Sequence, residues 1–174
     1  MSTNSPLIGE TFFLAGSLFW ISDYSPSARF AHTSAESSVW VSDSSIVCRS
    51  AKGLGRTHRL HVTLGVVAST LSEAWSYNAP AVAGGFARLN LPSTGSVLVT
   101  IQGTSFGLHD ASPSGRGGSS ACEATLWSSE TSLACLGRAG IASTRRFVVT
   151  ASRATGSVTQ VMSYDFPTVT HVAN

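Results

Sequence analysis

The sequence predicts an all-β fold made of two tandem β-sandwiches, and three observations support this prediction. A repeat with a period of 87 residues runs through the chain, whose length of 174 residues is two periods. Short segments rich in β-branched residues alternate with glycine and proline turn signals. No long stretch holds a helical period. We therefore expect two copies of one sandwich, each of ordinary domain size.

The repeat aligns without a gap. The segment 25–29, Ser-Pro-Ser-Ala-Arg, recurs as Ser-Pro-Ser-Gly-Arg at 112–116, and 21 of the 73 positions from 10 to 82 are identical at this offset. The second copy is expected to contain strands at 97–102, 121–127, 132–136, 146–151 and 157–166, with a change of register near Gln160. The intervening segment 103–118 is rich in glycine and proline, so we expect it to be a loop.

The offset also sets the expected domain boundaries. Residues 1–79 form a first sandwich that lacks its opening strand, because the segment equivalent to Pro80–Arg88 is missing from it. Residues 80–166 form a second, complete sandwich. Residues 167–174 match the opening strand of a next unit, and Val169 matches Val82.

An unfilled sheet edge exposes unpaired N–H and C=O groups and invites pairing with another chain. The first sandwich is expected to have such an edge. We expect the segment 167–174 to add to the first sandwich of another copy of the chain, through Pro167, Val169 and Val172.

Composition limits the classes of function. The net charge is +2, which is too little for a dedicated nucleic-acid binder. No apolar run is long enough for a transmembrane helix, and no basic start marks a signal peptide. The polar surface is built from 30 serines and 17 threonines more than from charges. No catalytic constellation or metal-ligand spacing is visible, so neither nucleic acid, membrane insertion, cofactor nor metal is expected.

A set of short motifs occurs in a fixed order along the second copy. The motifs lie at Pro80–Val82, Gly95–Gly107, Cys122, Ser129–Cys135, Phe147–Thr150 and Ser163–Pro167. In order and spacing they resemble the IPT/TIG immunoglobulin-like domain, and the first copy matches from Gly16 to Pro80. The resemblance implies two tandem immunoglobulin-like β-sandwiches without catalytic residues of their own. Such domains are often found in tandem on cell-surface receptors and large repeat proteins, and also in some transcription factors and carbohydrate-active enzymes.

The resemblance also implies a disulfide between Cys122 and Cys135; two buried thiols are the alternative. Ala35 stands where Cys122 stands in the other copy, so Cys48 lacks its partner. We expect Cys48 to be a buried apolar residue. An unpaired cysteine can also form a bridge between chains.

Aromatic and charged residues give the remaining candidates. Trp20, Tyr24 and Phe30 form the candidate contact surface. Trp40 and Trp127 recur, which favours a structural role in each unit, and Trp75 is expected in the core or between domains. Asp23 and Asp110, and the pairs Arg29–Glu36 and Arg116–Glu123, are interpreted as loop caps or hairpin ion pairs.

These features favour a non-enzymatic structural, adhesion or assembly module. The alternatives are an accessory or linker subunit of a larger complex and a carbohydrate-binding surface module. The expected partners are proteins, further copies of the chain joined through open edge strands, or glycans. The low lysine content and the implied disulfide favour an extracellular, cell-surface or lumenal location.

Overall fold

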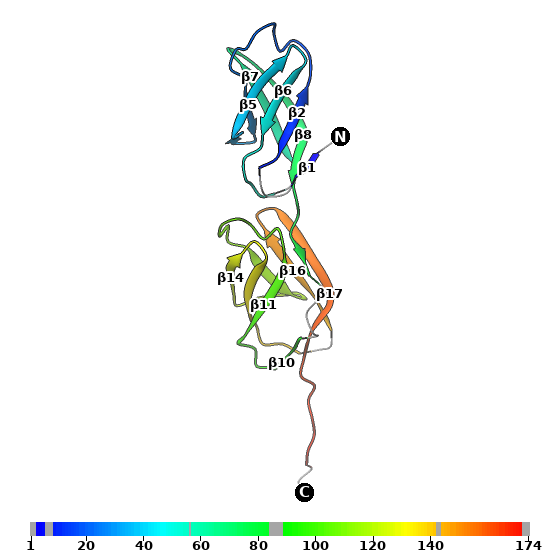
Figure 1. Cartoon of the computed structure of the whole chain (residues 1–174). Coiled ribbons are helices and arrows are strands. Elements are labelled where there is room, and N and C mark those ends of the chain that lie inside the picture. The colour runs from blue at the N-terminus through cyan, green and yellow to red at the C-terminus, as the bar shows by residue number, and fades with distance from the viewer. Residues whose placement is uncertain (1–2, 6–8, 56, 84–88, 142–143, 172–174) are drawn as a thin grey trace. The chain divides into compact units, whose positions relative to one another are not determined.

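The computed structural model describes the whole chain except residues 1–2, 6–8, 56, 84–88, 142–143 and 172–174. The chain divides into two units, Met1–Ala79 and Pro80–Asn174. All regular elements of the described residues are β-strands, so the prediction of an all-β fold is confirmed (Figure 1). None of these residues forms a helix that is long and apolar enough to cross a membrane.

The first unit contains two sheets. One sheet has the order β1-β8-β7-β3-β4, with strands Thr3–Ser5, Val67–Tyr77, His58–Leu64, Ser27–Phe30 and Thr33–Ser34. The other has the order β2-β6-β5, with strands Thr11–Ala15, Ser45–Arg49 and Ser37–Ser42. An aromatic cluster joins the two sheets. The ring of Phe12 on β2 lies 5.3 Å from that of Phe30 and 4.7 Å from that of Trp75, between ring centres.

The second unit repeats this plan and adds one strand. Its first sheet has the order β10-β17-β16-β12-β13, with strands Leu89–Leu91, Ala154–Tyr164, Arg145–Ala151, Ser114–Gly117 and Ser120–Ala121. Its second sheet has the order β14-β15-β11-β9, with strands Ala124–Ser129, Ser132–Gly137, Val97–Thr104 and Ala81–Val82. Alternate residues of the strands point inward. The core between the sheets includes Ile101, Phe106, Leu133, Phe147 and Val149.

The two units also share unusual backbone positions. Residues other than glycine seldom adopt a positive φ. Positive φ angles nevertheless recur at the 87-residue offset, in the pairs Leu18 and Ser105, Ser25 and Ser112, Ala31 and Gly118, Gly65 and Ser152, and Glu73 and Gln160. The bend at Gln160 lies where the pairing of β16 with β17 shifts register, near the position expected from the sequence. The two copies therefore bend at the same places.

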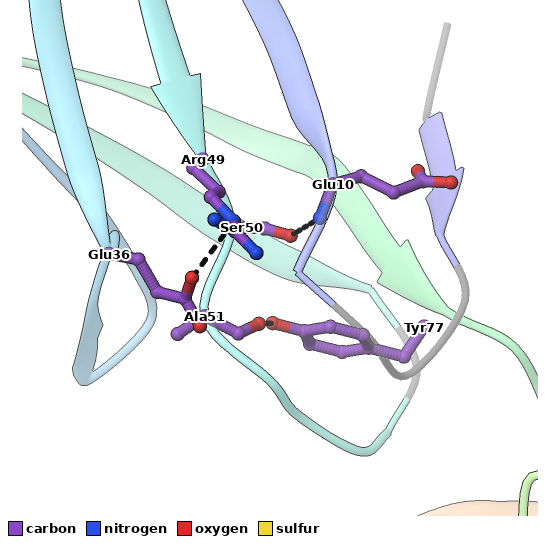
Figure 2. A network of polar contacts seen from close by, with 6 residues as sticks. All are labelled: Glu10, Glu36, Arg49, Ser50, Ala51 and Tyr77. Atoms are coloured by element: carbon purple, nitrogen blue, oxygen red, sulfur yellow. Dashed lines mark hydrogen bonds and ion pairs between the residues drawn. The ribbon is translucent and has the colours of Figure 1, made fainter.

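A buried tyrosine fixes the same corner of each unit. The hydroxyl of Tyr77 donates a hydrogen bond to the carbonyl of Ala51 (2.7 Å), as Figure 2 shows, and that of Tyr164 donates to the carbonyl of Arg138 (2.9 Å). Burial raises the pKa of the Tyr77 phenol, so the hydroxyl stays protonated and able to donate at neutral pH. The corner therefore stays closed under ordinary conditions.

One strand of the second unit falls where a loop was expected. The segment 103–118 contains β12, which pairs with β16, so that part of the prediction is wrong. Two glycines weaken the strand signal in this part of the sequence. Glycine is needed at both positions because neither leaves room for a side chain. A Cβ atom at Gly115 would lie 2.9 Å from the sulfur of Cys122, and one at Gly117 would lie 2.5 Å from the sulfur of Met162.

Candidate functional site

The cysteines of the two units are arranged differently. Cys122 and Cys135 form a disulfide, with their Cα atoms 5.7 Å apart. Cys48 is free and buried, and its sulfur lies 3.6 Å from the hydroxyl of Ser38. Burial raises the pKa of the Cys48 thiol, so it stays uncharged and is a poor nucleophile. The structure thus gives Cys48 the buried position expected from the sequence.

In the first unit, two alanines stand at the positions that Gly115 and Cys122 hold beside the disulfide of the second unit. Gly115 leaves space for the sulfur of Cys122 in the second unit. At the equivalent positions the first unit has Ala28, which is 2% exposed, and Ala35. The hairpin between these positions is the same in both units, because Ala35 donates its N–H to the carbonyl of Ala28 (2.8 Å) as Cys122 does to Gly115 (3.0 Å). The first unit therefore has a buried methyl group at residue 28, where the second unit has a glycine beside a disulfide sulfur.

The largest difference between the units is at one sheet edge. In the second unit, β9 pairs antiparallel with the end of β11, so that Val82 lies opposite Gly103 and Ala81 lies opposite Thr104. The N–H of Ala83 then donates to the carbonyl of Gln102 (2.9 Å). The Val82 side chain is partly buried against the core. The strand therefore closes the edge with both backbone and side-chain contacts.

Two glycines make room for β9. A Cβ atom at Gly103 would lie 2.2 Å from the carbonyl oxygen of Ala81, and one at Gly156, on β17, would lie 1.8 Å from the carbonyl oxygen of Pro80. Both contacts are with backbone, which has no alternative rotamer to adopt. The opening strand lies this close to both β11 and β17 because neither glycine carries a side chain.

The equivalent edge of the first unit is unfilled in the part of the chain that the structure describes. Here β2 is the last strand of its sheet, and no described strand pairs with its outer edge. Gly16 and Ser17, directly after β2, correspond to Gly103 and Thr104. A Cβ atom at Gly16 would meet the ring of Phe19 as its nearest neighbour, with no backbone carbonyl among the closest atoms. We call Gly16, Ser17 and the start of β8 at Val67–Leu71 the acceptor edge.

Apolar side chains along the acceptor edge are exposed. Phe106 is fully buried in the second unit, whereas its equivalent Phe19 is only partly buried. Ala154, at the start of β17, is 1% exposed, whereas Val67 at the equivalent position is 53% exposed. Leu71 is also largely exposed. The first unit therefore presents an unpaired backbone edge beside apolar surface, the combination that an added strand covers.

The candidate contact surface is smaller than the sequence indicated. Trp20 and Tyr24 are each about half exposed, and their rings meet edge to face with centres 5.6 Å apart. Phe30 does not belong to this surface, because it is 2% exposed and contacts Trp75 in the aromatic core. The inclusion of Phe30 was wrong. Trp20 adopts a φ of 69°, an uncommon conformation for a bulky residue, where the second unit has Gly107.

The strand-exchange residues lie beyond β17. Pro167 and Val169 belong to a segment that has no strand assignment and whose described part, up to His171, is exposed. Val172 lies outside the described residues. The expected exchange thus involves a described donor segment and a described acceptor edge, and it stays a prediction.

The remaining sequence candidates have local structural roles. Asp23 and Asp110 cap loops, since the side chain of each accepts the N–H two residues later, at 2.8 Å. Glu36 does not pair with Arg29; it forms an ion pair with Arg49 at 3.0 Å (Figure 2). The indole of Trp40 donates to the carbonyl of Phe19 at 2.9 Å, a structural contact.

Within the described ranges, no three His, Cys, Asp or Glu side chains are grouped so that they could hold a metal ion.

The residues of the acceptor edge could not be identified from the strand patterns of the sequence alone. The sequence signal lies in the comparison of the two copies, where Ser69 and Val67 replace Gly156 and Ala154. Only the structure shows that Pro80 lies against Gly156, which is far from it in the sequence. The effect of replacing Gly156 by serine therefore depends on a contact that the sequence does not reveal.

A family model matches the second unit, and solved structures are similar to much of the chain. Residues 87–165 match the family model of the IPT/TIG domain. The surface glycan-binding protein PbSGBP-B from Prevotella bryantii has a similar structure, with a TM-score of 0.52 and 14% identity over 90% of this chain and 37% of that one. The plexin A4 extracellular region gives a TM-score of 0.47 and 18% identity, over 93% of this chain and 15% of that one.

These likenesses bear on the fold alone, and this chain spans well under half the length of either structure. No curated protein sequence matches the chain.

Proposed function

We propose that this chain, whose second unit is an IPT/TIG domain of immunoglobulin-like fold, is an extracellular structural module that assembles by accepting a β-strand at the edge of its first unit. One observation carries this proposal. The edge that β9 closes in the second unit is unfilled by any described strand in the first unit, and exposed apolar side chains flank it. The match of residues 87–165 to the IPT/TIG domain supports a binding or structural role. The disulfide supports the extracellular location.

The energetics favour a reversible contact. An added strand would gain backbone hydrogen bonds worth roughly 1 kcal/mol each and would bury apolar surface at about 25 cal/mol per Å². Val67, Leu71 and Phe19 supply that surface. Association also costs several kcal/mol in lost freedom of motion. We therefore expect affinities on the order of micromolar, which corresponds to about 8 kcal/mol.

Sedimentation velocity tests this proposal directly. The average mass of the chain is expected to rise above 18.1 kDa as concentration rises through the micromolar range. Ser17→Pro should abolish this rise, because it removes an edge N–H and places a ring on the pairing surface. Ser17→Ala keeps the N–H and should behave like the unmodified chain. A chain that is monomeric at high micromolar concentration, or a Ser17→Pro variant that associates normally, contradicts the proposal.

A second candidate function is carbohydrate binding at Trp20 and Tyr24. Two half-exposed aromatic rings in contact form an apolar platform of the kind that stacks on a sugar ring. Trp20 also has a positive φ, a backbone conformation that clusters at binding sites. The Prevotella bryantii protein of similar fold is described as a surface glycan-binding protein. The support is the local geometry of the two rings.

Trp20→Ala tests the carbohydrate candidate. On an array of plant and bacterial polysaccharides, the unmodified chain is expected to bind at least one glycan. The substitution should weaken that binding about tenfold, the equivalent of ~1.4 kcal/mol for one aromatic contact. Ile21→Ala, which removes an exposed aliphatic neighbour, is the matched control and should have no effect. Equal losses in both variants, or no binding by the unmodified chain, would exclude this candidate.

A further inference from the structure

We infer that the strand accepted by the first unit is Pro167–His171 of a second copy of this chain, so that copies join head to tail. This inference rests on the proposed function and names its partner. The segment is described, exposed and without strand pairing in the single chain. It is therefore available for a contact with another molecule.

The donor segment repeats the chemistry of β9. At the 87-residue offset, the donor residues Pro167, Thr168 and Val169 correspond to Pro80, Ala81 and Val82. The last two of these form β9, which closes the edge of the second unit. Proline at the start of a strand loses no ladder hydrogen bond. The middle position is exposed in β9, so threonine fits there, and threonine favours strands. Val169 is 85% exposed in the single chain and would be covered as Val82 is.

The pairing of β9 with β11 predicts the register of the exchanged strand. By the same offset, Val169 lies opposite Gly16 and Thr168 lies opposite Ser17, in antiparallel orientation. Gly16 keeps the pairing surface clear of a side chain, as Gly103 does where the carbonyl of Ala81 approaches. The contact therefore uses backbone positions that the first unit already presents.

Association separates exchange between copies from a donor segment that folds back onto its own chain. Only exchange between copies raises the average mass above 18.1 kDa as the concentration rises.

One residue makes the accepted strand weaker than β9. The second unit has Gly156 where the Pro80 carbonyl approaches, and the first unit has Ser69. The Cβ of Ser69 therefore holds an incoming proline carbonyl further from β8. The contact between copies is expected to be reversible, and Ser69→Gly should strengthen it.

The contact joins two different surfaces of the chain, so two copies do not form a closed, two-fold dimer through it. Each copy that donates a strand still has an acceptor edge, and each copy that accepts one still has a donor segment. Heterologous contacts of this kind produce rings or open filaments. The inference therefore predicts growth beyond dimers.

Two substitutions of equal charge test the donor. Val169→Asp places a carboxylate where a side chain must be covered, so the average mass should stay at 18.1 kDa in sedimentation velocity. Thr168→Asp places the same charge at an exposed position and should associate as the unmodified chain does. Ser69→Gly should lower the concentration of half-association several-fold. Both donor positions are exposed in the single chain, so neither change disturbs its folding.

The possible failures are distinguishable. If Val169→Asp associates normally while Ser17→Pro does not, the acceptor edge binds a different strand, and this inference is overturned while the proposed function stands. If Val169→Asp and Thr168→Asp both abolish association, the effect is one of charge, and the proposed register is wrong. If the unmodified chain is monomeric throughout, both proposals fail together.

Discussion

Gly156→Ala is expected to push the start of β9 away from β17 and to lower the free energy of unfolding of the second unit by about 3 kcal/mol, at the upper end of the effect of overpacking. The added Cβ would lie 1.8 Å from the carbonyl oxygen of Pro80 and 2.6 Å from its carbonyl carbon. Backbone atoms cannot escape by changing rotamer, so the start of the strand must move. The hydrogen bond from Ala83 to Gln102 is weakened when it does.

Urea unfolding and amide hydrogen exchange measure these two consequences. The amide of Ala83 should exchange faster in Gly156→Ala than in the unmodified chain. Ser69→Ala is the matched control, because Ser69 holds the equivalent position in the first unit, where no described strand approaches. It should change stability by less than about 0.5 kcal/mol at low protein concentration. Unchanged stability together with a protected Ala83 amide would show that β9 does not lie against Gly156.

Cys122→Ala is expected to cost the second unit about 3 kcal/mol, because the disulfide closes a loop between residues 13 apart and restricts the unfolded chain. The first unit shows how a sandwich without this bridge is packed, with Ala28 in place of Gly115. Adding Gly115→Ala to Cys122→Ala should therefore recover about 1 kcal/mol, by filling the space and by replacing a glycine within a strand.

The critical measurement is whether Gly115→Ala raises or lowers the free energy of unfolding of the second unit. With the disulfide present, the new Cβ lies 2.9 Å from the sulfur of Cys122 and 3.0 Å from the ring of Phe147, so the substitution should destabilise the unit. Without that sulfur, we expect the Phe147 side chain to have room to move away. With Cys122→Ala the same substitution should stabilise it. A double-mutant cycle measured by urea unfolding compares the two effects. Equal effects in both backgrounds would show that residue 115 and the bridge are independent.

Much of the fold could be predicted because the sequence contains the sandwich twice. The segment predicted as a strand at 146–151 is observed as Arg145–Ala151, and the predicted register change lies at Gln160. The strand at Ser114–Gly117 has glycines at its two buried positions, where sulfur atoms that only folding brings close leave no room for a side chain. Its first-copy equivalent, Ser27–Phe30, has the same alternating burial, with Ala28 and Phe30 at those positions.

The candidate site could be predicted only in part. The donor segment was visible, because Pro167 and Val169 repeat Pro80 and Val82. The part played by Ser69 was not visible, because its meaning depends on the approach of Pro80 to Gly156 in space. Phe30 was misplaced for a similar reason, since β3 turns it toward Trp75 and away from Trp20.

A complementation experiment tests strand exchange most directly. Ser17→Pro keeps its donor segment and loses its acceptor edge, whereas Val169→Asp keeps its acceptor edge and loses its donor. Each variant alone should be monomeric. In an equimolar mixture, one donor and one acceptor remain for each pair of chains, so sedimentation velocity should show a species of twice 18.1 kDa and nothing larger. A mixture that stays monomeric, or one that grows beyond two chains, contradicts head-to-tail strand exchange.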